Sequence, residues 1–157
     1  TGTTADVLLG GAGNDELLAN AGLTTMTGGA GNDVFVIDTA SLNVNSYATI
    51  TDFAAGDLLQ MTGAASFTSA KVTLGGTAVF QDFANAAINA LATNGAGWFQ
   101  FGGDTYVVAD MPAGVSPAPA DNPSAFVNGQ DFIVKLTGLI DLSQASFNNT
   151  HDTIALV

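Results

Sequence analysis

A short motif that recurs at a fixed interval near the amino terminus constrains the fold more than any other feature of this sequence. Residues 10–18 read GGAGNDELL and residues 28–36 read GGAGNDVFV, so six identical residues return after 18 positions. Because 18 is twice nine, the frame divides residues 1–36 into four nonapeptides. A chain with such a period is expected to stack repeated units on one another.

The two other nonapeptides keep the frame with substitutions. Residues 1–9, TGTTADVLL, retain Gly2, Asp6 and Leu8 at the corresponding positions. Residues 19–27, ANAGLTTMT, carry Thr24 at the position where the other units have aspartate. We interpret the segment as two intact and two altered copies of one unit.

Each position of the nonapeptide has a physical role. Glycine at the first, second and fourth positions permits positive φ and exposes backbone carbonyls in a tight turn. Aspartate at the sixth position adds a carboxylate, and the last three residues form a short strand whose middle side chain points inward. These inward positions are all apolar: Leu8, Leu17, Met26 and Phe35. If one nonapeptide forms half a coil, turns 10–15 and 28–33 stack in a parallel β-roll.

The charge and composition restrict the chemistry of such a stack. The chain has 14 acidic residues against Lys71 and Lys135, a net charge of −12, one histidine and no cysteine. Nucleic-acid binding and docking on an anionic membrane both need basic residues, so neither partner is expected. Zinc sites and thiol or Ser-His-Asp catalysis are disfavoured. Aspartate and glycine carbonyls suit a hard cation such as Ca²⁺.

The tandem nonapeptides resemble the RTX (repeats-in-toxin) signature, GGxGxDxUx, of calcium-binding parallel β-rolls. The segment ITDFAAGDLLQM at 50–61 is similar to the segment that closes such rolls, and this resemblance implies that Asp52 and Asp57 cap the last calcium site. For Asp52, a cap on its own turn is the alternative. About two to four calcium ions are expected. The candidate metal ligands are Asp6, Gly10, Gly11, Gly13, Asp15, Gly28, Gly29, Gly31, Asp33, Asp52 and Asp57.

Two later segments carry a narrower resemblance. WFQFGGDTYVVAD at 98–110 and FVNGQDFIVKLTGLIDLS at 126–143 resemble the carboxyl-terminal region of Caulobacter-type RTX surface-layer (S-layer) proteins. This resemblance implies a secreted protein of the bacterial cell surface that assembles with copies of itself into a two-dimensional lattice. Because the chain begins at Thr1 without methionine, we expect it to be a processed or excised piece.

The rest of the chain is expected to be rich in β-strands, with one short helix. Short strands at 71–74 and 78–80 would flank Gly75-Gly76 as a hairpin. A helix is expected at 83–92, with Asp82 as its N-cap and Asn94-Gly95 as its end. A second hairpin would turn at Gly102-Gly103.

The last third combines a proline-rich loop with further strands. Residues 111–125 contain all four prolines and are expected to form a surface loop. Asn128-Gly129 predicts a hairpin between strands at 126–127 and 131–136, and two more strands are expected at 139–142 and 153–157. The fold class is therefore mainly β, with a roll and its capping segment at 1–60 and a β-rich region at 61–157.

Three features outside the repeats bear on function. Trp98, Phe99 and Phe101 are expected in the core, with sugar stacking as the alternative. His151 is expected at the surface, because no second histidine or nucleophile motif accompanies it. Asp152 before the apolar TIALV terminus resembles the uncleaved export signal of type I secreted RTX proteins, and an ordinary closing strand is compatible with that role.

These observations lead to one expected function and two alternatives. The chain is expected to be no enzyme but the calcium-dependent assembly region of an S-layer protein, exported by a type I ABC transporter and folded by calcium outside the cell. It could instead be the RTX tail of a secreted protease or lipase, or a calcium-binding adhesive module. No nucleic acid partner and no membrane insertion are expected, since no apolar run approaches about 20 residues.

Overall fold

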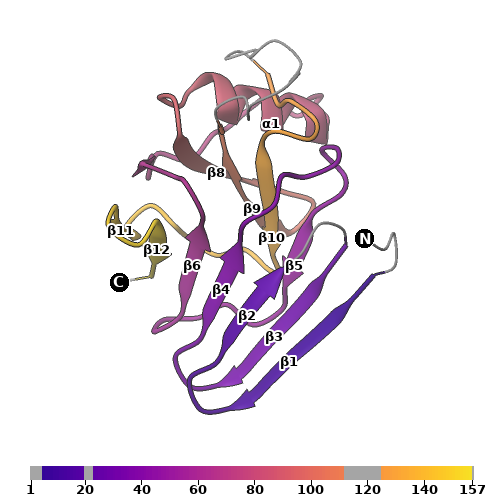
Figure 1. Ribbon diagram of the computed structural model, residues 1–157. Helices are drawn as coiled ribbons and strands as arrows, with labels where there is room; N and C mark the ends of the chain where they lie inside the picture. The colour runs from indigo at the N-terminus through magenta and orange to yellow at the C-terminus, as the bar shows by residue number, and fades with distance from the viewer. Residues whose placement is uncertain (1–4, 20–22, 112–124, 157) are drawn as a thin grey trace.

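The computed structural model describes residues 5–19, 23–111 and 125–156. It is mainly β with one short helix, which confirms the expected fold class (Figure 1). The elements are β1 (Val7–Ala12), β2 (Glu16–Ala19), β3 (Thr25–Ala30), β4 (Val34–Ile37), β5 (Ala48–Ile50), β6 (Leu58–Met61), β7 (Ser66–Phe67), α1 (Phe80–Asn89), β8 (Gly95–Phe101), β9 (Asp104–Ala109), β10 (Phe132–Leu136), β11 (Ser146–Asn148) and β12 (Thr153–Ala155).

The strands form two sheets, and the first six strands alternate between them. The seven-stranded sheet has the order β1-β3-β5-β10-β9-β8-β7, and the five-stranded sheet has the order β11-β12-β6-β4-β2. These six strands run parallel within their sheets. Strands β1, β3 and β5 are parallel neighbours in the seven-stranded sheet, and β2, β4 and β6 are parallel neighbours in the five-stranded sheet. We name the pairs β1–β2, β3–β4 and β5–β6 the first, second and third coils.

The register of the coils follows the sequence period and then departs from it once. Val7 pairs with Thr25 in the first two coils, an offset of 18 residues. Thr25 then pairs with Thr49 and Val34 with Leu58, an offset of 24. The additional residues lie between β4 and β5, so turn 52–57 still takes the place of turns 10–15 and 28–33.

The inward positions of the repeats build the core of the roll. Met26 and Phe35 are completely buried, Leu17 is nearly so, and Leu8 at the end of the stack is half-buried. The same hydrophobic cluster continues into later strands, and its members there include Trp98, Val107, Val134, Leu136, Leu142 and Ile154. Burial of the eighth position of the nonapeptide is thus confirmed.

The amino-terminal and carboxyl-terminal segments share both sheets. Strand β10 pairs parallel with β5, and β12 pairs antiparallel with β6. The expected boundary at residue 60 falls within β6. The third coil is therefore flanked by later strands in both layers, whereas β1 and β2 are the last strands of their sheets in the described part of the chain.

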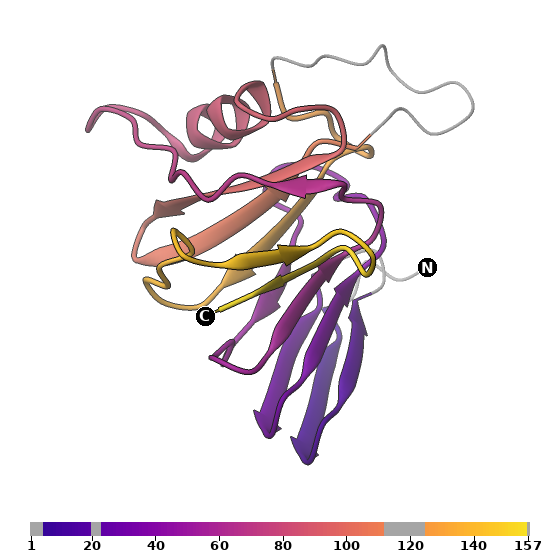
Figure 2. The same ribbon diagram turned by 90° about the vertical axis from the view of Figure 1, so that its left-hand side faces the viewer.

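Helix α1 covers the seven-stranded sheet at the end of the molecule away from the turns (Figure 2). It begins at Phe80 rather than Phe83 and ends at Asn89. Asp82 is not the N-cap but lies in the first turn, where its carboxylate accepts the Val79 N–H at 2.9 Å. The earlier start is explained by packing, because Phe80 contacts Phe99, Phe101 and Tyr106 edge-on.

Two expected hairpins and one expected strand do not form. Residues 71–74 and 78–80 make no hairpin, since only Val72 forms a single bridge, to Phe99, and Phe80 belongs to the helix. Residues 126–131 form a compact turn in which the buried Asp131 carboxylate accepts the Val127 N–H at 2.7 Å, so no hairpin forms at Asn128-Gly129. The stretch 139–142 is not a strand. The backbone N–H of Ile140 donates to the Thr105 hydroxyl oxygen and not to a neighbouring strand.

Other expectations in this region are confirmed. Gly102 and Gly103, with φ of 62° and 95°, join β8 to β9 in the expected hairpin. The last strand forms over Thr153–Ala155, shorter than expected. The proline-rich loop lies outside the described residues except for its ends. No helix in the described part of the chain is long and apolar enough to cross a membrane.

Candidate metal centre

Three turns lie together at one end of the roll, where each first strand of a coil passes to the second (Figure 1). They comprise residues 10–15, 28–33 and 52–57, and the parallel registers place equivalent residues directly beside one another. The sixth position is aspartate in all three turns. Asp15, Asp33 and Asp57 therefore form one row, which we name the aspartate ladder.

The second and third rungs of the ladder each accept a backbone N–H from the preceding coil. The Asp15 N–H donates to Oδ1 of Asp33 at 2.9 Å, and the Asp33 N–H donates to Oδ1 of Asp57 at 2.9 Å. Asp33 is only 1% exposed and Asp57 is 5% exposed. The ladder thus holds carboxylates at the interior side of the turns, where solvent screens them poorly.

The first rung contains an oxygen without a partner. Oδ2 of Asp15 is buried and accepts no hydrogen bond from any described residue. A buried carboxylate oxygen without a donor costs free energy, and such an atom in a folded protein calls for an ion or water. A cation beside the first turn would satisfy this oxygen.

Carbonyl oxygens of the first turn lie close to the glycines of the second turn. Gly29 and Gly31 have φ of 101° and 139°, and a Cβ on either would collide with the Gly11 or the Gly13 carbonyl oxygen of the neighbouring turn. A side chain at these positions would therefore close the space between the turns. Only glycine satisfies both the backbone angle and this close approach.

The first glycine of each turn has a different role. A Cβ on Gly10 would lie 2.8 Å from Oδ2 of Asp15, and a Cβ on Gly28 would collide with Oδ2 of Asp33. Each aspartate thus folds back over the first glycine of its own turn. This packing explains why glycine and aspartate recur together five residues apart.

Asp52 closes the stack in a way that the sequence does not specify. It occupies the place of Gly28 in the third turn, and its two oxygens accept the N–H groups of Gly28 at 3.0 Å and Gly29 at 2.8 Å. The cap within turn 52–57 is made by Asp57, whose Oδ2 accepts the Ala54 N–H at 2.9 Å. The alternative expectation, a cap within its own turn, therefore holds for Asp57 and not for Asp52.

The repeated asparagine was missed as a structural residue. Oδ1 of Asn14 accepts the Asn32 N–H at 3.0 Å, so the fifth position also links neighbouring turns. A Cβ on Gly56, the next residue in this column, would lie 2.5 Å from Oδ1 of Asn32. The signal was present in the sequence, because GGAGND repeats with its asparagine intact.

Asp6 is not brought together with the aspartate ladder. It is exposed and precedes β1, whereas turn 10–15 follows that strand, so the two lie at opposite ends of the roll. Its neighbours in the stack are Thr24 and Ala48, which carry no carboxylate. If Asp6 binds a metal ion, its own carboxylate is the only one at that site, and the other ligands have to be backbone carbonyl oxygens.

The donor set decides which ion the turns can hold. Within the described residues, no three His, Cys, Asp or Glu side chains are grouped to bind a metal, so carboxylates alone do not complete a site. Backbone carbonyls must supply the remaining ligands. Six to eight oxygen ligands of this mixed kind are typical of Ca²⁺, whereas zinc prefers nitrogen and sulfur.

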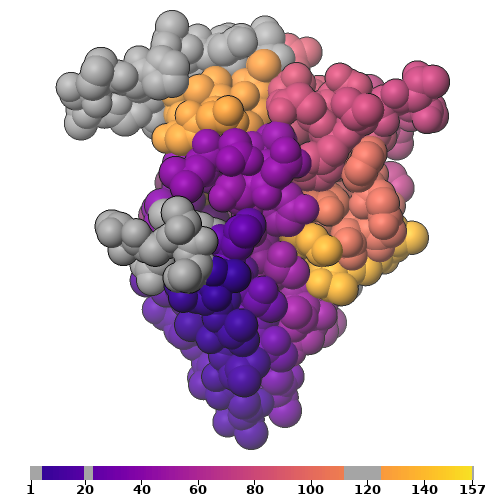
Figure 3. Space-filling model, turned by 90° about the vertical axis from the view of Figure 1, so that its right-hand side faces the viewer, coloured from indigo at the N-terminus to yellow at the C-terminus, as the bar shows by residue number. Residues whose placement is uncertain are grey.

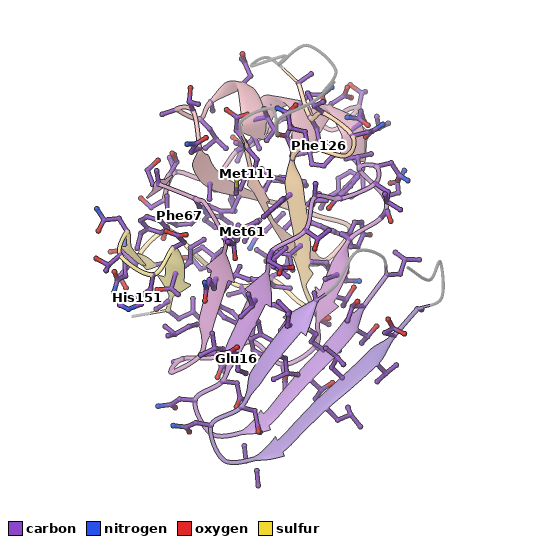
Figure 4. All side chains as sticks on the ribbon, viewed as in Figure 1. Glu16, Met61, Phe67, Met111, Phe126 and His151 are labelled. Carbon is purple, nitrogen blue, oxygen red and sulfur yellow. The ribbon has the colours of Figure 1, made fainter. Side chains whose placement is uncertain are left out.

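Ionisable and aromatic residues elsewhere are accounted for structurally. His151 is exposed at the carboxyl-terminal side of the molecule, away from the turns, as expected (Figure 4). Asp104 accepts the Gly138 N–H at 2.8 Å and pairs with Lys135 at 2.8 Å, and these two contacts hold the pKa of its carboxyl below the usual range. Trp98 and Phe99 are buried in the core, and the Trp98 indole N–H donates to the Ser69 carbonyl.

A comparison with protein families matches the same part of the chain. Residues 1–35 match the RTX calcium-binding nonapeptide repeat, in four copies. The comparison with curated proteins gave no match. The match agrees with the four nonapeptides of the sequence and with the stacked turns. These repeats bind Ca²⁺ and mark a calcium-binding region of a secreted protein.

Proposed function

We propose that this chain is the calcium-dependent structural and assembly region of a bacterial S-layer protein, exported by a type I ABC transporter, and that it has no catalytic role. Calcium binding by the RTX repeats is the premise. Asp15, Asp33 and the carbonyls of the glycine-rich turns would hold the ion. Calcium supplies positive charge that offsets the repulsion between the stacked carboxylates.

The observation that carries the proposal is the connection between the turns and the rest of the fold. Turn 52–57 joins β5 directly to β6, and these two strands pair with β10 and β12. Order in the stacked turns is therefore transmitted through the third coil to strands from the carboxyl-terminal half. A calcium-binding roll that shares both sheets with its neighbour is suited to switching the whole region rather than a detached tail.

The two segments that resemble S-layer proteins lie in the middle of this shared sheet. Residues 98–110 contribute to β8 and β9, and residues 126–143 contain β10. Strand β10 lies between β9 and β5, so both segments are connected to the roll through backbone pairing. This placement supports a role for calcium in presenting the region to neighbouring subunits.

Net charge supports calcium-dependent assembly. At −12, copies of this chain repel one another, and each bound Ca²⁺ removes two negative charges. Residues 1–70 contain no lysine or arginine, so the roll has no internal cation to replace calcium.

Burial of the last strand supports export before folding. Ile154 of β12 is completely buried, between β11 and β6 in the sheet order. A transporter can read this segment only while the chain is unfolded. Low calcium inside a cell would keep the roll open, and higher calcium outside would close it.

Electron microscopy of the purified chain tests the assembly proposal. We expect ordered sheets when calcium is added, none in excess chelator and none for Asp33→Asn in calcium. Asp38→Asn is the matched control, because Asp38 is exposed and outside the ladder, and it should assemble like the parent. A calcium-loaded, folded chain that never forms ordered assemblies would favour the hydrolase-tail or adhesive-module alternative.

A further inference from the structure

The carboxylate of Asp52 binds two consecutive backbone N–H groups of the second turn, residues 28–33. Its Oδ1 accepts the Gly28 N–H at 3.0 Å, and its Oδ2 accepts the Gly29 N–H at 2.8 Å. In a regular strand successive N–H groups point to opposite sides, but at Gly29 the φ of 101° turns both groups to the same side. Such a pair of N–H groups forms a nest, a concavity of the backbone that binds anions.

The nest determines where the Gly28 carbonyl points. In a planar trans peptide the C=O and the N–H point in opposite directions. Because the Gly29 N–H is directed at the third turn, the Gly28 oxygen in the same peptide is directed at the first turn. The structure has this orientation, since a Cβ on Gly10 in the first turn would lie 2.6 Å from the Gly28 oxygen.

The Gly28 oxygen and the unpartnered oxygen of Asp15 approach the same point. A Cβ on Gly10 would lie 2.8 Å from Oδ2 of Asp15, and this oxygen is buried and accepts no hydrogen bond from any described residue. Glycine at position 10 leaves the space beside both oxygens free of a side chain. Two oxygens this close to one point can belong to the ligand shell of a single Ca²⁺ ion, whose oxygen ligands lie at about 2.3–2.6 Å.

The second turn is held in this way only from its far side. One coil earlier, the position of Asp52 is occupied by Gly28, which has no side chain to accept N–H groups from the first turn. Residues 1–70 contain no lysine or arginine, so the two N–H groups of the nest stabilise the Asp52 charge in place of a basic side chain. The second turn is therefore anchored to the third and presents its carbonyl to the first.

We propose that Asp52 is a positioning residue for a calcium ion between the first and second turns, and that it orients the Gly28 carbonyl toward this ion without touching the ion. The inference deepens the calcium binding on which the proposed function rests. It differs from the role that the family resemblance implies, in which Asp52 caps the last calcium site. The turns form the narrow lower end of the molecule, where an ion can enter from solvent (Figure 3).

Titration calorimetry and native mass spectrometry of Asp52→Asn test this role. Asparagine keeps the length of the side chain but offers one acceptor oxygen, and its NH₂ group faces the second N–H, so the nest loses half of its anchor. Groups that orient metal ligands from outside typically contribute ten- to a hundredfold to metal affinity. We expect the variant to bind as many calcium ions as the parent, one of them at least about tenfold more weakly.

Asp152→Asn is the matched control. Oδ2 of Asp152 also accepts a glycine N–H from a neighbouring segment, that of Gly63 at 2.8 Å, but beyond the opposite end of β6 from the calcium turns. The control removes the same charge and the same kind of hydrogen bond. It should bind calcium like the parent.

An Asp15→Asn background assigns the effect to one ion. Asp15→Asn weakens the site beside Gly10 directly, because it changes the unpartnered carboxylate oxygen there. If Asp52 acts on the same ion, adding Asp52→Asn should lower the remaining calcium affinity by less than about twofold. A further loss as large as in the single variant would place Asp52 at a different ion and overturn the inference.

The carbonyl carbon of Gly28 gives a readout that a merely structural role would not change. Its ¹³C resonance should move when calcium is added to the parent, because coordination polarises the C=O bond, and it should move less in Asp52→Asn. If Asp52 only stabilised the fold, Asp52→Asn would lower stability equally in calcium and in chelator and would leave this calcium-induced change intact.

The outcomes separate this role from the proposed function. Loss of one bound ion in Asp52→Asn would make Asp52 a ligand, and unchanged calcium affinity would make it irrelevant to the ion; either result overturns the positioning role while the parent still binds calcium and can assemble. A parent that shows the expected Gly28 response but forms no ordered sheets would contradict S-layer assembly and leave the role of Asp52 intact.

Discussion

The middle rung of the aspartate ladder allows a test in which the sign of a stability change reverses with calcium. In Asp33→Asn the amide oxygen can still accept the Asp15 N–H, so the shape of the turn is kept while one negative charge is removed. Asp33 is buried between Asp15 and Asp57, one coil away on either side. The variant thus loses two carboxylate repulsions and one calcium ligand together.

The expected magnitudes follow from the stacking distance. Neighbouring parallel strands are about 4.8 Å apart, so each repulsion is worth about 1–3 kcal/mol at effective dielectric constants between water and a protein surface. Weakening of the hydrogen bonds offsets about 1 kcal/mol. In chelator, Asp33→Asn should therefore be more stable than the parent by about 1 kcal/mol or more.

In calcium the same variant should be less stable. One calcium site stabilises the fold by about 2.7 kcal/mol when the free calcium concentration is a hundred times its Kd. Asp33 lies between two neighbouring turns, so its carboxylate can contribute to a site on each side. Loss of both contributions removes about 5 kcal/mol, and the gain of about 1 kcal/mol from relieved repulsion remains, so the variant should be less stable than the parent by up to about 4 kcal/mol.

Urea unfolding in calcium and in chelator, followed by circular dichroism and Trp98 fluorescence, measures both signs. Asp38→Asn, which removes an exposed charge outside the ladder, is the control and should change stability by less than about 0.5 kcal/mol in both conditions. If Asp33→Asn changes stability by the same amount with and without calcium, the ladder does not couple charge to calcium and the reasoning fails.

Three further substitutions test the turns, the ion pair and the shared sheet. Gly31→Ala should cost about 2 kcal/mol more in urea unfolding than Gly102→Ala, because both glycines have positive φ but only at Gly31 would the methyl group collide with a carbonyl. Since the folded pKa of Asp104 is lowered from 3.8, its stabilisation is present above that pH and is lost as the pH falls through the folded value; Asp104→Asn should flatten this acid limb in pH-dependent unfolding. Ile154→Ala should destabilise the calcium-loaded chain by about 2–5 kcal/mol and also lower calcium affinity in calorimetry, whereas unchanged affinity would show that β12 does not support the third coil.

The repeats could be predicted from sequence because their determinants are local. Glycine, aspartate and the inward apolar residue recur within nine positions, and parallel stacking follows from the period. The third turn was harder to predict. Its sequence, DFAAGD, aligns with GGAGND only when the longer connection between β4 and β5 is taken into account. Asp52 and Asp57 were found through the resemblance, but their different hydrogen bonds became visible only in the structure.

Beyond the roll, the failures share one physical cause. Gly75-Gly76 and Asn128-Gly129 are strong local turn signals, yet neither is flanked by strands that pair with each other. Phe80 packs in an aromatic cluster, and Asp131 binds backbone groups of its own turn and of Met111. These tertiary contacts outweigh local propensity, and no pattern within a short window reveals them.

The two ends of the aspartate ladder are stabilised by different means, and this explains why calcium contributes more at the first rung than at the last. Asp52 and Asp57 receive four backbone N–H groups, from Gly28, Gly29, Asp33 and Ala54, which partly offset their charge without any ion. Asp15 has a buried oxygen without a donor from the described residues, and no described strand pairs with the outer edge of β1 or β2. Since hydrogen bonds and adjacent strands support the third coil, the free energy supplied by calcium matters most for the first coil.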